Sequence, residues 1–149
     1  MTGPARFAIA AWAATLLCWG GQDPGLEQIG RIADLERRSR QALAFALEQF
    51  DAAVAAYRSG DVEKGKQALG TMGAAVKMAV EALQATGKHP RRHPRHFKHA
   101  EIRTRKLLRQ LSEERARALL EDRDDFDDAI RDVEKANVDL LLGIMSRRD

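Results

Sequence analysis

Twelve residues in the middle of the chain hold its densest group of chemically active side chains. All four histidines lie between Lys88 and His99, in the sequence Lys-His-Pro-Arg-Arg-His-Pro-Arg-His-Phe-Lys-His. Arginine and lysine bind anions such as phosphate and carboxylate, whereas neutral imidazole is a common ligand of transition metals. The segment therefore supports two kinds of binding chemistry, one for anions and one for metal ions.

The basic side chains predict a site for an anionic surface or an acidic partner. Residues 88–109 contain nine Lys or Arg and one acid, Glu101, for a formal charge of +8. Pro94 suits the first turn of a helix, where free backbone N–H groups add to the attraction for anions. A solvated run of charge that keeps the protein soluble is the alternative. The expected contacts, all within residues 88–106, are Arg91, Arg92, Arg95, Lys98, Arg103 and Arg105.

The histidines support an alternative function, the binding of Zn²⁺, Cu²⁺ or Ni²⁺. His96 and His99 are three residues apart and share one face of a helix, while His89 and His93 lie on the link before it. The surrounding Lys and Arg repel a cation, and Glu101 is the nearest carboxylate in that run. A third interpretation is a pH sensor, because imidazoles titrate near ~6.5 and mild acid adds positive charge to the link.

Motifs of catalysis are absent from the sequence. It contains no nucleophile elbow, phosphate-binding loop, dinucleotide fingerprint or haem attachment motif. Phe97 is the single aromatic residue of the basic run, and no helix-turn-helix precedes it, so nucleic acid ranks below anionic lipid, cell-wall polymer or an acidic protein as the partner. We therefore predict a non-enzymatic binding protein without a cofactor.

The N-terminus has the features of a secretory signal peptide. Arg6 precedes an apolar run over residues 7–19, and Cys18-Trp19-Gly20 offers a cleavage site. This run is shorter than the ~20 residues that span a bilayer. We predict that residues 1–20 direct export, to the periplasm, and are removed. Lipidation of Cys18 is the alternative, which the bulky Leu17 before it disfavours.

The remaining residues, 21–149, have helical periodicity throughout and predict a single domain. Apolar residues recur at steps of three and four, while Ser59-Gly60-Asp61 and the charged residues 121–125 indicate turns. Pro90 and Pro94 interrupt the middle of the chain. These signals predict an all-α, up-and-down four-helix bundle built from two helical hairpins, monomeric or weakly self-associating. The expected helices are 25–58, 61–86, 94–121 and 125–146.

Three glycines and one asparagine carry further expectations about packing. Gly65, Gly70 and Gly73 each cost a helix up to ~1 kcal/mol relative to alanine, so we expect a neighbouring helix to approach closely there. A slot for a ligand is the alternative. Asn137 interrupts the apolar stripe of the last helix, where a buried Asn most often fixes the register between helices.

Charge is segregated along the chain. Residues 113–134 contain ten acids and four Arg, for a formal charge of −6, against +8 for residues 88–109. In the predicted bundle these segments fall toward opposite ends. The start of the mature chain is expected at the basic end.

Overall fold

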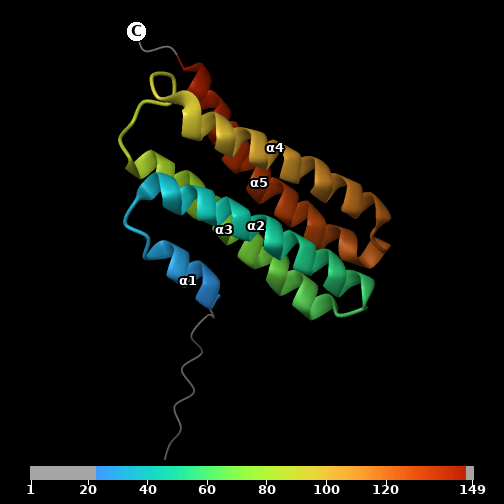
Figure 1. Cartoon of the computed structure of the whole chain (residues 1–149). Coiled ribbons are helices and arrows are strands. Elements are labelled where there is room, and N and C mark those ends of the chain that lie inside the picture. Colours follow the sequence, from blue (N-terminus) through green and yellow to red (C-terminus); the bar gives the residue numbers. More distant parts are fainter. Residues whose placement is uncertain (1–22, 147–149) are drawn as a thin grey trace, which may run out of the picture.

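The computed structural model describes residues 23–146, and every regular element within them is a helix (Figure 1). The elements are α1 (Pro24–Gly30), α2 (Leu35–Arg58), α3 (Val62–Ala85), α4 (Pro94–Arg117), the 3₁₀ helix η1 (Leu120–Asp122) and α5 (Arg123–Met145). The prediction of an all-α helical bundle is confirmed. The predicted signal peptide, residues 1–20, and Cys18 lie outside the described residues.

The helix count differs from the prediction, because the described chain has five α-helices rather than four. The expected first helix, 25–58, is broken at residues 31–34. Asp34 starts α2 as its N-cap, accepting a hydrogen bond from the Arg37 backbone N–H at 3.0 Å. The Arg38 guanidinium donates to the Ile32 carbonyl, which satisfies one backbone acceptor that the break leaves free.

The other helix boundaries follow local signals. Asp61 caps α3 by accepting from the Lys64 N–H at 3.2 Å, and Gly60 before it has a φ of +81°, a conformation that glycine adopts without strain. α4 and α5 are separate helices, since Ala118 and Leu119 are extended. The predicted boundaries at 121 and 125 were therefore a few residues late.

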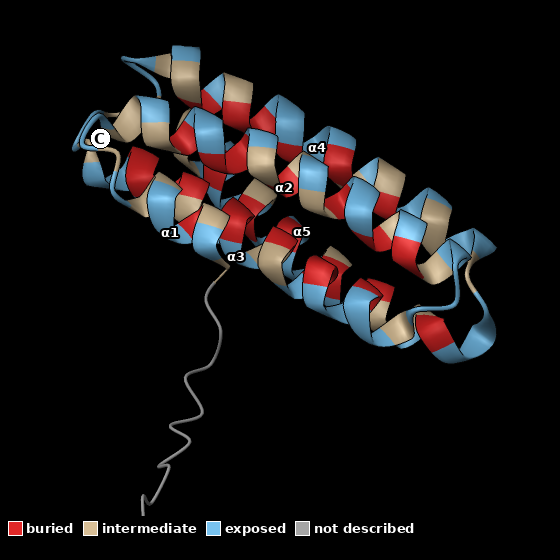
Figure 2. Ribbon diagram, turned by 60° about the horizontal axis from the view of Figure 1, so that its bottom comes forward, coloured by how far each residue is buried: buried red, intermediate tan, exposed pale blue. Residues whose placement is uncertain are grey.

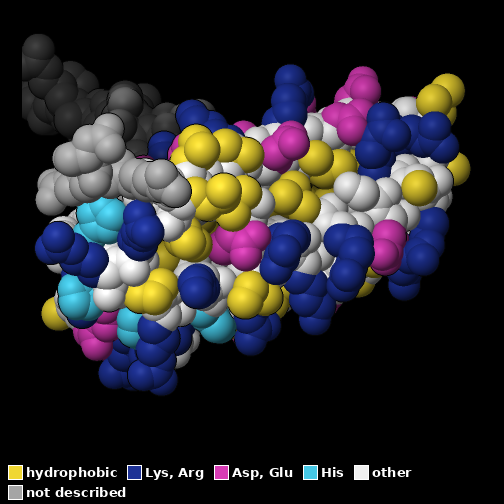
Figure 3. Space-filling model, turned by 90° about the horizontal axis from the view of Figure 1, so that it is seen from above, with side chains coloured by type: hydrophobic (Ala, Val, Ile, Leu, Met, Phe, Trp, Pro, Cys, Tyr) yellow, Lys and Arg dark blue, Asp and Glu magenta, His cyan; other side chains and the backbone are white. Residues whose placement is uncertain are grey.

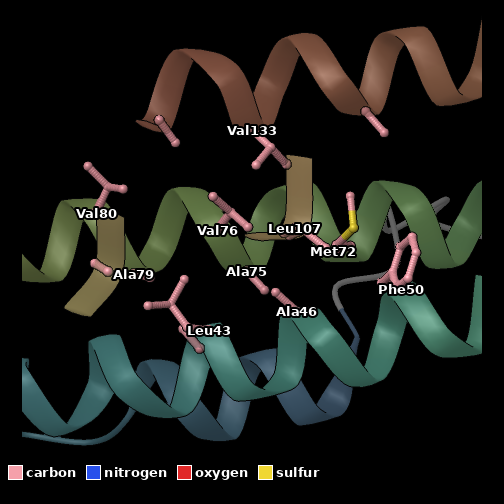
Figure 4. Packing of buried hydrophobic residues seen from close by; sticks show 14 of the residues in the cluster. Leu43, Ala46, Phe50, Met72, Ala75, Val76, Ala79, Val80, Leu107 and Val133 are labelled. Carbon is pink, nitrogen blue, oxygen red and sulfur yellow. The ribbon is translucent and has the colours of Figure 1, made fainter. Parts of the chain in front are cut away.

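The four long helices form two hairpins that share one core. α2 packs along α3, α4 packs along α5, and the hairpins meet most extensively between α3 and α5 (Figures 1 and 2). α2 and α3 approach closely because alanines line their contact, and Ala46 and Ala75 are completely buried (Figure 4). The larger core side chains come from every long helix: Leu43, Phe50, Met72, Val76, Leu83, Leu107, Leu111, Phe126 and Val133.

The three glycines of α3 divide into two kinds. A Cβ on Gly65 would lie 2.6 Å from the Tyr57 ring, and one on Gly73 would lie 3.4 Å from the Asp132 carboxylate, so neighbouring helices do approach these positions. Nothing lies within 4 Å of a Cβ on Gly70, for which the prediction of close packing is wrong.

The start of the domain lies beside the middle of the bundle rather than at its basic end. α1 folds back along α2 and α3, and a Cβ on Gly25 would lie 2.8 Å from the Phe45 ring, about halfway along α2. The first described residues, 23–30, therefore lie away from the basic end, where the start of the mature chain was expected. Between Asp23 and Ser146, no helix combines the length and apolarity needed to cross a membrane.

Candidate functional site

The link between α3 and α4, residues 86–93, lies at the end of the bundle where α5 finishes. Gly87 turns the chain with a φ of +65°, and the Thr86 hydroxyl accepts from the Lys88 N–H at 3.2 Å. Pro90 packs against α5, because a Cβ on Gly143 would lie 3.2 Å from the proline ring. The link therefore presents its basic residues beside the last turn of α5.

One carboxylate of α2 meets a lysine and a histidine of the basic segment. Glu36 accepts a hydrogen bond from Lys88 Nζ at 2.6 Å, and its other oxygen lies 3.1 Å from His96 Nε2. The Lys88 hydrogen bond is the main reason that the pKa of Glu36 lies below its usual range. Glu36 thus offsets the positive charge of Lys88 on the link. A shallow pocket of about 350 Å³ here is lined by Glu36, Lys88, His93, Pro94, Arg95, His96 and Lys98.

The four histidines have different surroundings and do not form one cluster. His89 Nδ1 accepts from the Arg91 N–H, His93 is the exposed N-cap residue of α4, and His96 faces Glu36. Half-buried His99 has a pKa below its usual range, chiefly because of burial and then because of the Arg103 guanidinium. Over residues 23–146, no three His, Cys, Asp or Glu side chains are placed to share a metal ion.

All six predicted anion-binding residues are exposed, but they do not share one face. Arg91 and Arg92 lie on the link, and Arg95 and Lys98 lie in the first turns of α4. Arg103 and Arg105 are two residues apart on α4, which places them roughly 160° apart around the helix. Within the described chain only one of the six residues is in an ion pair, Arg105 with Glu101 at 3.5 Å.

A row of basic residues runs further along α4 than expected. Its members recur at helical spacing on the solvent side of the helix, and Figure 3 shows Lys and Arg side chains along this side of the molecule. Lys106 and Arg109 were missed as site residues; with Ile102 and Arg105 they line a shallow hollow of about 540 Å³. The 3.6-residue period would have found them. We call this surface the basic face: Arg95, Lys98, Arg105, Lys106 and Arg109.

Acidic residues near the other end have partners within the bundle. Arg115 forms a two-pronged pair with Asp127, which lowers the pKa of that carboxyl. Tyr57 donates a hydrogen bond to Asp125 at 3.0 Å. Thus Asp125 and Asp127 are bonded to other helices, whereas Arg105 is the one residue of the basic face with an ion pair in the described chain.

Comparison with known proteins gives no match: no protein-family model, curated protein or solved structure is significantly similar to this chain.

Proposed function

We propose that this protein acts by binding, and that its ligand is an anionic surface or polymer held by the basic face and the link arginines Arg91 and Arg92. One observation carries the proposal. Among residues 23–146, four of the five basic-face residues and both link arginines form no ion pair, although the rest of the bundle pairs many of its charges.

Electrostatic repulsion makes this arrangement unfavourable for the isolated protein. Lys and Arg placed three or four residues apart on a helix repel one another by about 0.2–0.5 kcal/mol per pair. An anionic ligand would relieve that repulsion and would gain from each cation that it meets. The binding should be strongly salt-dependent, because exposed charges are screened over about 10 Å at ~0.1 M salt.

Titration with long-chain inorganic polyphosphate at increasing salt concentrations tests this proposal. We expect the affinity to fall on the order of tenfold or more between ~50 and ~200 mM salt. The triple variant Arg95→Gln, Lys98→Gln and Arg105→Gln should lose most of the binding.

A second triple variant controls for net charge. Lys64, Lys77 and Lys135 are exposed and lie outside the basic face, so their replacement by Gln removes the same three charges from another surface. We expect this variant to bind polyphosphate nearly as well as the unchanged protein. Equal losses in both triple variants, or an affinity unaffected by salt, would contradict the proposal.

A further inference from the structure

Helix α5 carries a second apolar stripe that the core does not use. Val138, Leu141, Leu142 and Met145 follow the spacing i, i+3, i+4 and i+7, which places them on one side of the helix. Their exposed fractions are 44%, 41%, 61% and 68%, whereas Val133 and Leu140 of the core stripe are buried. We call these four residues the apolar stripe. The helix therefore has one apolar side in the core and another toward solvent.

The apolar stripe lies beside the basic face. Asn137 Nδ2 donates to the Thr104 hydroxyl at 2.8 Å and to the Glu101 carbonyl at 3.1 Å, which fixes the turns of α4 that face this part of α5. Ile102 of the same α4 turn is 54% exposed. Figure 3 shows hydrophobic side chains gathered next to Lys and Arg on this face, toward the end with the histidines.

We infer that the apolar stripe and the basic face together bind the surface of an anionic lipid bilayer. This rests on the proposed function and names its partner. The stripe's side chains enter the boundary between headgroups and acyl chains, while Lys98 and Arg105 bind lipid phosphates. Each Lys or Arg near an anionic membrane strengthens binding roughly fivefold, and a few apolar side chains add to this without a shaped pocket.

The size and charge of this surface favour a bilayer over a protein partner. A stable protein–protein interface takes about 20–30 residues from each side, with charged residues depleted at its centre. Here the exposed apolar part is the four-residue stripe and Ile102, with cations directly beside it. Amphipathic surfaces that bind anionic membranes combine apolar and basic side chains in this way.

A fluorophore on the stripe measures its insertion directly. Because Cys18 is the single cysteine, the full chain with Cys18→Ser accepts one label at Met145→Cys or, as a control, at exposed Ala52→Cys of α2. Vesicles of phosphatidylglycerol mixed with phosphatidylcholine are the probe. We expect a blue shift and quenching by a bilayer-embedded quencher at position 145 but neither at position 52. Pure phosphatidylcholine should give much weaker binding.

Two double variants separate the stripe from general hydrophobicity. Leu142→Ser with Met145→Ser should weaken vesicle binding on the order of tenfold and leave polyphosphate binding unchanged. Leu119→Ser with Leu120→Ser is the matched control, since these residues are 65% and 80% exposed near the opposite end of the bundle. It should bind vesicles normally. The apolar run 7–19 is the same in these two double variants and in the protein with which they are compared, so its contribution cancels.

The outcomes distinguish this inference from the proposed function. If the label at position 145 stays in water while the chain binds vesicles, or if both double variants bind equally well, the inference is overturned while polyphosphate binding still supports the proposed function. If the protein self-associated through the apolar stripe and did not bind vesicles, the partner of the stripe would be a second copy of this chain. That result would also overturn the inference. If the unchanged protein bound neither vesicles nor polyphosphate, both the inference and the proposed function would be refuted.

Discussion

Replacement of Gly65 and of Gly70 by alanine should have opposite effects on stability, although both residues lie within α3. At Gly70 a new methyl group meets nothing within 4 Å, so Gly70→Ala should stabilise the protein by about 0.5–1 kcal/mol, the difference in helix propensity. At Gly65 the same methyl group would lie 2.6 Å from the Tyr57 ring.

The Tyr57 ring cannot move aside freely. Its hydroxyl donates to Asp125 at 3.0 Å, and its ring lies 5.0 Å from the Phe126 ring, centre to centre. Overpacking of this kind costs about 1–3 kcal/mol, and loss of the hydrogen bond adds about 0.5–1.5 kcal/mol. After the gain in helix propensity, Gly65→Ala should destabilise the protein by about 0.5–4 kcal/mol.

Urea unfolding followed by far-ultraviolet circular dichroism measures both changes. Tyr57 is the single tyrosine, and both tryptophans, Trp12 and Trp19, precede the described residues. The fluorescence of Tyr57 is therefore the signal that reports the Gly65 site directly. In a Tyr57→Ala background, Gly65→Ala should no longer destabilise, because the opposing ring is gone. A Gly65→Ala protein as stable as Gly70→Ala, with tyrosine fluorescence unchanged, would refute the reasoning.

Three further changes test other parts of the structure. Asn137→Ala should lower the free energy of unfolding by about 1–2 kcal/mol in urea, because the buried Thr104 hydroxyl and the Glu101 carbonyl lose a donor. His93→Asp should raise it by about 1 kcal/mol in the same assay, since α4 has no side-chain cap and Asp supplies one. For His99 the folded pKa lies below the unfolded value, so the unfolded chain takes up the proton first and stability falls as the pH drops below ~6.5. The loss between about pH 7.5 and about pH 5.5 should be smaller in His99→Gln, and an equal loss would assign the pH dependence to other groups. The positive charges that oppose protonation of His99 are those of Arg103 and of Arg40 in α2.

Features fixed by neighbouring residues could be predicted from the sequence. The turn at Gly60 and Asp61, the start of α4 at Pro94 and the buried stripes of α4 and α5 depend on local conformation and on the helical period. The same local logic would have found the break before α2, because Asp34 is a good N-cap. The predicted helix 25–58 instead ran through this cap.

Features that depend on distant parts of the chain could not be predicted. Glu36 and Lys88 are 52 positions apart and meet only because α2 and the link are at the same end of the bundle. Gly70 and Gly73 have the same propensity for a helix, and only the position of α5 determines which of them has a neighbour. The apolar stripe is visible as a period, but its exposure depends on how α4 packs against the other side of α5.

The start of α4 departs from the pattern of the helices before it, and this departure coincides with the basic face. α1, α2 and α3 begin at Asp23, Asp34 and Asp61, whose carboxylates accept backbone N–H groups. α4 instead begins at His93 without a side-chain cap, has Arg95 and no acid in its first turn, and so opposes its own helix dipole. A change to the common pattern would stabilise the fold but would reduce the positive charge that the proposed anion binding needs. Stability and binding therefore make opposite demands on these residues, as is expected where a surface serves function rather than folding.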